Sequence, residues 1–196
     1  MSFINHNAKV IHLKVVYYGP SLSGKTTNVR YIYQQTGAED AQLKELNTDV
    51  ERTFFFDFLP LGIGDIRGYQ TRFHIFTVPG QVVYDASRRF IMKGLDGVIF
   101  VADSQKERME ENLQSLKNLE KNLEQQGYDI REIPLVMQYN KRDLPHISST
   151  TEMRNLLNPY NAPEIEACAS RGTGVLESLK TVSKSIVHVL KGGALI

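Results

Sequence analysis

Residues 19 to 26 read GPSLSGKT, which matches the pattern G-x-x-x-x-G-K-[ST] of a phosphate-binding loop. The β-branched run VIHLKVVYYG (10 to 19) before it predicts a strand, and the residues after it predict a helix over 24 to 35. A phosphate-binding loop requires this strand-loop-helix context. The alternative, an ordinary glycine turn that carries a surface lysine, does not explain the flanking elements.

Each residue type in this loop has a chemical reason. Gly19 and Gly24 allow the backbone to curl so that its N–H groups point at phosphate oxygens, and the helix dipole adds to the attraction. Lys25 is expected to neutralise the β and γ phosphates, and the Thr26 hydroxyl to bind magnesium. The predicted nucleotide contacts of this loop are Gly19, Ser21, Ser23, Gly24, Lys25, Thr26 and Thr27.

Strands and helices alternate along the rest of the chain. Further strands are predicted over residues 53–61, 69–78, 97–103, 133–140 and 163–169, and helices over 109–123, 150–157 and 175–189. This order predicts an α/β P-loop NTPase fold in one domain spanning 1–196. Its mostly parallel, six-stranded sheet has one antiparallel edge strand, from the 53–78 hairpin, and helices on both faces.

The composition narrows the class of protein. With 196 residues, 41% hydrophobic and 23% charged, and a net charge of +1, the chain can bury one core and has no basic excess that would favour nucleic acid. It has one cysteine, no run of about 20 apolar residues and no signal peptide, so we expect a cytoplasmic protein. Its ends carry neither a myristoylation glycine nor a prenylation cysteine, so no direct membrane anchor is expected.

The stretch NKRD (140 to 143) at the end of a buried strand indicates which base is bound. The Asp143 carboxylate can accept hydrogen bonds from the N1–H and N2–H groups of guanine, whereas adenine presents an acceptor at N1. Asn140 is expected to support the ring and the neighbouring loops, and the stem of Lys141 to lie over the face of the base. The sequence therefore favours a guanine nucleotide.

Together these stretches resemble the Ras-like small GTPases, and among them the bacterial MglA type that governs gliding motility and cell polarity. The resemblance covers about residues 9 to 145 and rests on VVYYGPSLSGKTTN, ERTFFFDFLPL, TRFHIFTVPGQVVYDASRRFIMKGLDGVIFVADS and QYNKRDLP. It implies a monomeric Ras-like G domain that binds GTP or GDP with Mg²⁺ and hydrolyses GTP. It also implies a homodimeric roadblock-domain activating partner, and effectors that locate the GTP form at a cell pole.

The resemblance also implies roles for single residues. The segment ACAS resembles the third base-contacting loop of small GTPases and adds Cys168, Ala169 and Ser170, of which the Ala169 N–H would reach the guanine O6. Gln81, directly after Gly80, matches the glutamine that orients the attacking water.

The segment before the second strand supplies further matches. Arg52 matches an arginine finger that acts in cis, although from the residues alone a solvated loop charge is the alternative. Thr53 would be the switch threonine that senses the γ phosphate and magnesium. The predicted catalytic residues are thus Gln81, Arg52 and Lys25.

The metal shell raises a separate question, because Thr77 stands where other small GTPases carry aspartate. Threonine is characteristic of the MglA type. The one charge inside FFFDFLP, Asp57, is a candidate to replace the lost carboxylate, and a side chain that points to solvent from an edge strand is the alternative. The predicted metal-linked residues are Thr26, Thr53 and Asp57.

Three further points stay open in the sequence. Ser21 stands where small GTPases usually have glycine, so it either crowds Gln81 and slows hydrolysis or fits without penalty. The basic side chains of Arg88, Arg89 and Lys93 form either a solvated face or a partner surface. The rival functions are a hydrolysis-poor, nucleotide-loaded module that recruits polarity partners and a P-loop nucleotide kinase, which the NKRD stretch disfavours.

Overall fold

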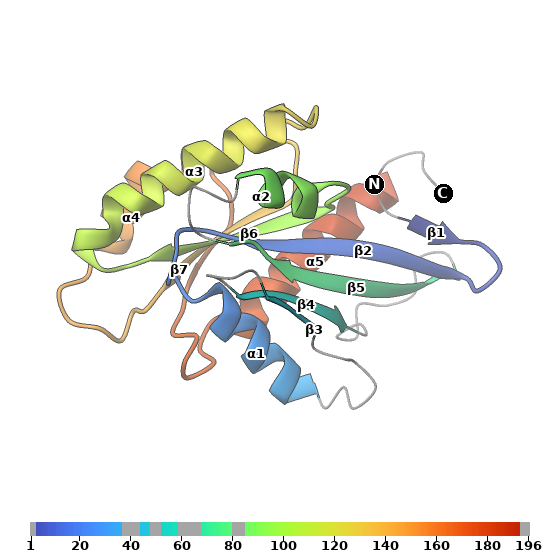
Figure 1. Cartoon of the computed structure of the whole chain (residues 1–196), viewed down its shortest axis with the longest axis horizontal. Coiled ribbons are helices and arrows are strands. Elements are labelled where there is room, and N and C mark those ends of the chain that lie inside the picture. The colour runs from blue at the N-terminus through green and yellow to red at the C-terminus, as the bar shows by residue number, and fades with distance from the viewer. Residues whose placement is uncertain (1–2, 37–43, 48–51, 59–67, 80–84, 193–196) are drawn as a thin grey trace.

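The computed structural model describes residues 3–36, 44–47, 52–58, 68–79 and 85–192, whose strands and helices alternate along the chain (Figure 1). The strands are β1 (Phe3–Asn5), β2 (Val10–Tyr18), β3 (Lys44–Asn47), β4 (Arg52–Phe58), β5 (Gln70–Thr77), β6 (Gly97–Asp103), β7 (Leu135–Asn140) and β8 (Glu164–Glu166). The helices are α1 (Lys25–Thr36), α2 (Asp85–Met92), the short 3-10 helix η2 (Lys106–Arg108), α3 (Met109–Glu124), α4 (Thr150–Leu157) and α5 (Val175–Gly192).

Among the described residues, eight strands form one sheet in the order β3-β4-β5-β2-β6-β7-β8, with β1 paired to β2. Strands β5, β2, β6, β7 and β8 run parallel to one another, whereas β4 is antiparallel to β5 and β3 is antiparallel to β4. The predicted fold class is therefore confirmed, and all six predicted strands form. The structure adds the short strands β1 and β3 to them.

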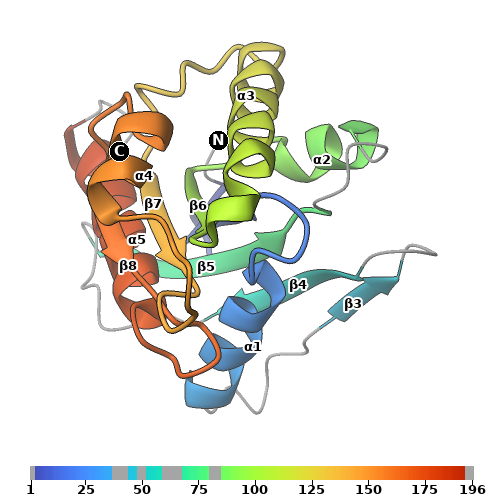
Figure 2. The same cartoon turned by 90° about the vertical axis from the view of Figure 1, so that its left-hand side faces the viewer.

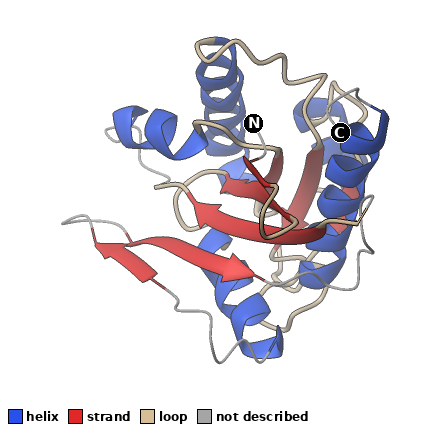
Figure 3. Cartoon of the chain, turned by 90° about the vertical axis from the view of Figure 1, so that its right-hand side faces the viewer, coloured by secondary structure: helices blue, strands red, loops and turns tan. Residues whose placement is uncertain are grey.

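Helices cover both faces of the sheet, with α1 and α5 on one face and α2, α3 and α4 on the other (Figures 1 and 3). The alternation of side chains along the strands explains this arrangement. In β2, Val15 and Tyr17 pack into the core under α1 and α5, whereas Val16 and Tyr18 pack into the core under α2, α3 and α4. Both cores are apolar and buried, which fixes the central strands as a rigid platform.

Most strand boundaries lie within two residues of the predictions, and two strands need comment. The strand predicted over 163–169 is shorter, since β8 ends at Glu166 and the residues after it form a loop. The strand predicted over 53–61 is β4, and residues 59–61 lie outside the described part of the chain. Within the described ranges, no helix is both long and apolar enough to cross a membrane.

Candidate functional site

Three loops meet at the carboxyl edge of the sheet, after β2, β7 and β8 (Figure 2). The buried side chain of Asn140 joins them, because its Nδ2 donates to the Ser23 carbonyl at 2.8 Å and its Oδ1 accepts from the Ala169 N–H at 2.9 Å. The sequence predicted that Asn140 supports neighbouring loops, and these two bonds provide that support. Contact of Asn140 and of the Ala169 N–H with a base stays a prediction.

Two glycines of the first loop have conformations and surroundings that exclude a side chain. Gly19 has φ +145° and Gly24 has φ +101°, a region that residues with a Cβ rarely adopt. A Cβ on Gly19 would lie 2.2 Å from the Val101 carbonyl oxygen, and one on Gly24 would lie 2.2 Å from Asn140 Nδ2. Glycine at these positions therefore lets the loop approach both β6 and the Asn140 amide.

Lys25 begins α1 and is buried, with 7% of its surface exposed. Its ammonium group donates to the carbonyls of Gly19 at 2.9 Å and Pro20 at 2.6 Å, so the charge lies inside the curve of the loop. Thr26 and Thr27 follow in the first turn of α1, the first half-buried and the second exposed. A buried ammonium beside a helix N-terminus is a suitable environment for an anion.

A buried polar network lies beneath the loops after β2 and β8, and the sequence analysis did not predict it. Gln138 of β7 donates from Nε2 to Asn28 Oδ1 at 2.9 Å and to Ser178 Oγ at 2.8 Å. Asn28 in turn donates to the Gly24 carbonyl at 2.9 Å, and Ser178 donates to the Gly174 carbonyl at 2.7 Å. The network thus connects the loop after β2 with the loop after β8. A polar residue within the buried run LVMQYN was the available signal.

Asp103, the last residue of β6, is a second site residue that the sequence analysis missed. Its side chain is 1% exposed, and its Oδ2 accepts from Lys141 Nζ at 2.6 Å. The Gln105 N–H donates to Asp103 Oδ1 at 3.1 Å. Lys141 has φ +65°, so its backbone adopts a left-handed conformation and its side chain is held by a buried carboxylate. This pair fixes the stem that was predicted to lie over the base.

Asp143 is exposed at the start of the segment after β7 and faces the loop after β8. A hydrogen bond with the Cys168 side chain, helped by its own backbone N–H and the charge of Arg171, holds the pKa of the Asp143 carboxyl below its usual value. The Arg171 guanidinium lies 3.7 Å from Asp143 Oδ2. Cys168 is buried, and its Sγ also lies 3.3 Å from Ser170 Oγ. Asp143 is therefore a charged, acceptor-only group at neutral pH.

The strand register bears on the predicted metal residues. Thr77 is buried at the carboxyl end of β5, where it pairs with Tyr17. Asp57 pairs with His74, three residues earlier in β5, which is about 10 Å along the strand at about 3.3 Å per residue. The role of Asp57 as a replacement for the carboxylate missing at Thr77 stays a prediction. The Asp57 side chain itself lies outside the described part of the structure.

The remaining predicted switch residues are described only in part. Arg52 and Thr53 begin β4, which runs antiparallel to β5, so their backbone lies at the edge of the sheet where Thr77 ends β5. Their side chains, and both Gly80 and Gln81, lie outside the described residues. The roles predicted for these four residues stay predictions.

The exposure of the Arg88 side chain, in α2, differs from the prediction. Its side chain is 2% exposed, its Nε donates to the Pro79 carbonyl at 3.0 Å, and its NH1 donates to Asn118 of α3. Both interpretations given for Arg88, a solvated face and a partner surface, are therefore wrong. Arg89 and Lys93 are exposed, as those interpretations require. A buried guanidinium needs such hydrogen bonds, and here they attach α2 and Pro79 to α3.

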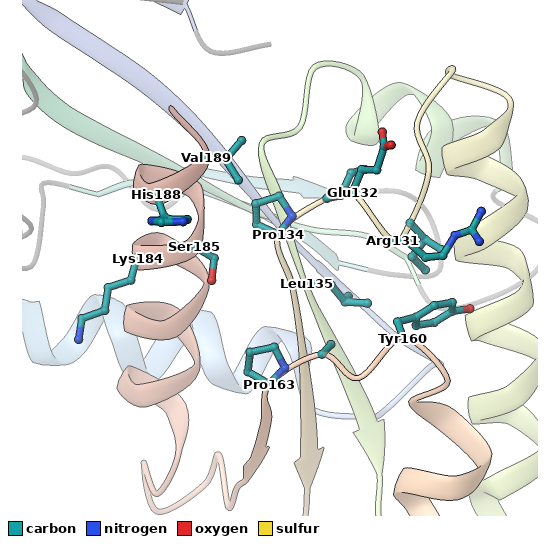
Figure 4. A pocket seen from close by; sticks show the side chains of 13 residues that line it. Arg131, Glu132, Pro134, Leu135, Tyr160, Pro163, Lys184, Ser185, His188 and Val189 are labelled. Carbon is teal, nitrogen blue, oxygen red and sulfur yellow. The ribbon is translucent and has the colours of Figure 1, made fainter. Parts of the chain in front are cut away.

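A cavity of about 560 Å³ lies at the opposite edge of the sheet (Figure 4). Pro134 and Pro163, which directly precede β7 and β8, line it together with Tyr160, Lys184 and His188. Its lining contains none of the predicted site residues. This cavity is therefore separate from the three loops at the carboxyl edge.

Comparisons with known proteins agree with this geometry. The model of the ADP-ribosylation factor family (Arf) matches residues 3–186. "Mutual gliding-motility protein MglA" of Myxococcus xanthus is 58% identical over 194 residues, which cover 98% of this chain and 100% of that protein. "Uncharacterized protein MJ1339" of Methanocaldococcus jannaschii is 27% identical over 170 residues, or 87% of this chain and 94% of that protein.

Proposed function

We propose that this chain, which belongs to the ADP-ribosylation factor family and is a small GTPase of the MglA type, is a GTP-controlled switch in gliding motility or cell polarity. The observation that carries the proposal is the Asn140 side chain, which ties the phosphate-binding loop to the loop beside the base motif. A site built in this way binds phosphates and base as one unit.

Guanine selectivity comes from the Asp143 carboxylate. An aspartate carboxyl is ionised at neutral pH, and the lowered pKa of Asp143 extends that range downward, so the group accepts hydrogen bonds and donates none. Guanine presents two donors to such a group, whereas adenine presents an acceptor that the carboxylate repels. Lys141, held by buried Asp103, supports the face of the base.

The phosphates bind between the loop after β2 and the first turn of α1. Lys25 neutralises their charge, and the helix N-terminus adds N–H donors. Thr26, the second residue of α1, is half-buried and carries a hydroxyl that suits magnesium, and Thr53 is the second proposed hydroxyl ligand. When bound, Mg²⁺ supplies positive charge to the β and γ phosphates.

Hydrolysis uses Gln81 and Arg52 in this proposal. Gln81 orients the attacking water, and Arg52 donates to the charge that develops on the transferred phosphoryl group. The position of Arg52 at the start of β4, beside the edge where β5 ends, supports its role. The Pro79 carbonyl, two residues before Gln81 in the sequence, accepts a hydrogen bond from the buried Arg88 side chain.

The GTP form is long-lived in this proposal, because the Cβ and hydroxyl of Ser21 crowd the hydrolysing arrangement. Effectors read that form, a homodimeric roadblock-domain protein accelerates its hydrolysis, and partners recruit the protein to a pole. The similarity to the gliding-motility protein of Myxococcus xanthus supports a role with regulators of gliding motility, whereas the roadblock-domain and polar partners rest on the family resemblance alone.

Nucleotide competition and single-turnover hydrolysis test the proposal together. GTP and GDP should displace a fluorescent GDP analogue in a magnesium-dependent manner, and ATP should not. GTP loaded on the protein should then be hydrolysed slowly alone and faster with a roadblock-domain partner. If ATP competes equally, guanine selectivity is wrong. If the loaded GTP persists in every condition, the rival function of a nucleotide-loaded binding module is correct.

A further inference from the structure

Side chains hold several backbone carbonyls of the phosphate-binding loop. Lys25 Nζ donates to the carbonyls of Gly19 and Pro20, and Asn140 Nδ2 donates to that of Ser23. In a trans peptide the carbonyl and the following N–H point in opposite directions. Fixing the Pro20 or Ser23 carbonyl therefore also fixes the direction of the next N–H, which is the group that binds phosphate in such loops. The Gly19 carbonyl precedes Pro20, which has no N–H.

The carbonyl of Ser21 is held by a residue outside every motif. Arg108, the last residue of η2, donates from NH2 to the Ser21 oxygen at 2.9 Å. Its NH1 donates to Glu111 Oε1 at 2.6 Å, so the carboxylate orients the guanidinium. The Arg108 side chain is 28% exposed. Arg108 thus connects the start of α3 to the third position of the phosphate-binding loop, 87 residues earlier in the chain.

Leu22, which follows Ser21, has a backbone conformation that needs the hydrogen bond from Arg108. Leu22 has φ +62°, in the left-handed region, where a Cβ lies too close to the following carbonyl oxygen. Its side chain is 80% exposed, so packing of that side chain contributes little to holding the conformation. Such a backbone conformation persists only where surrounding contacts stabilise it. The Arg108 bond acts on the peptide between Ser21 and Leu22 and is a contact of this kind.

We propose that Arg108 is a positioning residue that holds the Ser21–Leu22 peptide with its N–H turned toward the phosphates. This inference rests on the proposed binding of nucleotide in the loop. The guanidinium acts through the backbone, and Glu111 keeps it in place. Without Arg108, the strained Leu22 conformation is less populated, and the loop presents one phosphate donor fewer.

The first test replaces Arg108 by alanine. Because hydrogen bonds from charged groups are among the stronger ones, Arg108→Ala should release GDP about tenfold faster and slow single-turnover GTP hydrolysis. Lys106→Ala is the matched control. Lys106 lies two residues before Arg108, its side chain is exposed, and its replacement removes an equal charge. Stopped-flow release of a fluorescent GDP analogue measures the dissociation rate, and thermal unfolding confirms that each variant is folded.

The second test separates loop positioning from packing of α3. Glycine adopts a positive φ without penalty, so Leu22→Gly added to Arg108→Ala should restore slow GDP release. Leu22→Ala in the same background keeps a Cβ and should not restore it. Leu22→Gly in the unmodified background completes a double-mutant cycle between two residues that act on one peptide.

Two results would overturn the inference. Arg108→Ala could release GDP at the rate of Lys106→Ala, or Leu22→Ala could rescue as well as Leu22→Gly. Either outcome leaves the proposed function intact, because the unmodified protein would still bind GDP. If the unmodified protein binds no guanine nucleotide, the proposed function itself fails, and the inference fails with it.

Discussion

Truncation of Asn140 should weaken nucleotide binding more than any other single change of comparable size. Asn140→Ala removes the donor to the Ser23 carbonyl and the acceptor of the Ala169 N–H, both in buried hydrogen bonds. The two loops that hold phosphates and base then lose their common anchor. The Ser23 carbonyl and the Ala169 N–H each lose their hydrogen-bond partner inside the protein.

The expected loss of GDP affinity follows from the cost of leaving these two backbone groups unsatisfied. An unsatisfied buried polar group costs about 1–3 kcal/mol, so about 1.5 kcal/mol for each gives about 3 kcal/mol. At about 1.4 kcal/mol for each factor of ten, GDP affinity should fall on the order of 100-fold. The loss appears in binding because the free protein can relax its loops, whereas the bound form needs both loops ordered.

Asn158→Ala is the matched control for this change. Asn158 is also buried and bonds the backbone of one residue in both directions, to the Ala162 carbonyl at 2.8 Å and from the Ala162 N–H at 2.9 Å. It lies at the end of α4, so its truncation should lower the free energy of unfolding and leave GDP affinity nearly intact. Isothermal titration with GDP and urea denaturation measure the two quantities.

The reasoning is refuted if Asn140→Ala binds GDP with unchanged affinity, or if Asn158→Ala loses as much affinity as Asn140→Ala. The second outcome would mean that any buried asparagine affects binding through global stability. The anchor would then have no special role.

Three other changes test separate parts of the site. Asp143→Asn should shift base preference from guanine toward xanthine, because an amide can donate where the carboxylate only accepts; unchanged preference for GTP over xanthosine triphosphate in competition would contradict this. Gln138→Leu should lower the free energy of unfolding by about 2 kcal/mol in urea denaturation, because Asn28 and Ser178 lose their common partner, and an unchanged midpoint would show that the network is dispensable. Ser21→Gly should hydrolyse GTP several-fold faster with similar affinity, and an equal or slower rate would mean that serine is tolerated.

The central elements could be predicted because their signals are local. β2 is rich in β-branched and aromatic residues, β6 is apolar up to Asp103, and α3 and α5 carry apolar side chains at helical spacing. β3 was missed because its four residues, KELN, lack the β-branched and aromatic residues that indicate a strand. The motif loops were found because glycine, lysine and asparagine at fixed spacing have a chemical reason that the sequence displays.

Contacts between segments that lie far apart in the chain could not be predicted from the sequence, because they depend on the tertiary structure. Arg88 and Arg89 are adjacent and equally charged, yet only Arg88 is buried, because the rotation of α2 over α3 decides which arginine is covered. The distance of Asp57 from Thr77 depends on the register between β4 and β5. The partnership of Asp103 with Lys141 joins the ends of β6 and β7, which only the sheet order brings together.

Single-turnover hydrolysis of GTP tests the central claim most directly. The protein is loaded with GTP, excess nucleotide is removed, and phosphate release is followed for the unmodified chain, Gln81→Leu and Arg52→Ala. The account predicts slow release from the unmodified chain and a further loss of tenfold or more in each variant, which is about 1.4 kcal/mol or more of barrier, with GTP affinity nearly intact. Equal release from all three proteins, or none from the unmodified chain even with an activating partner, would contradict it.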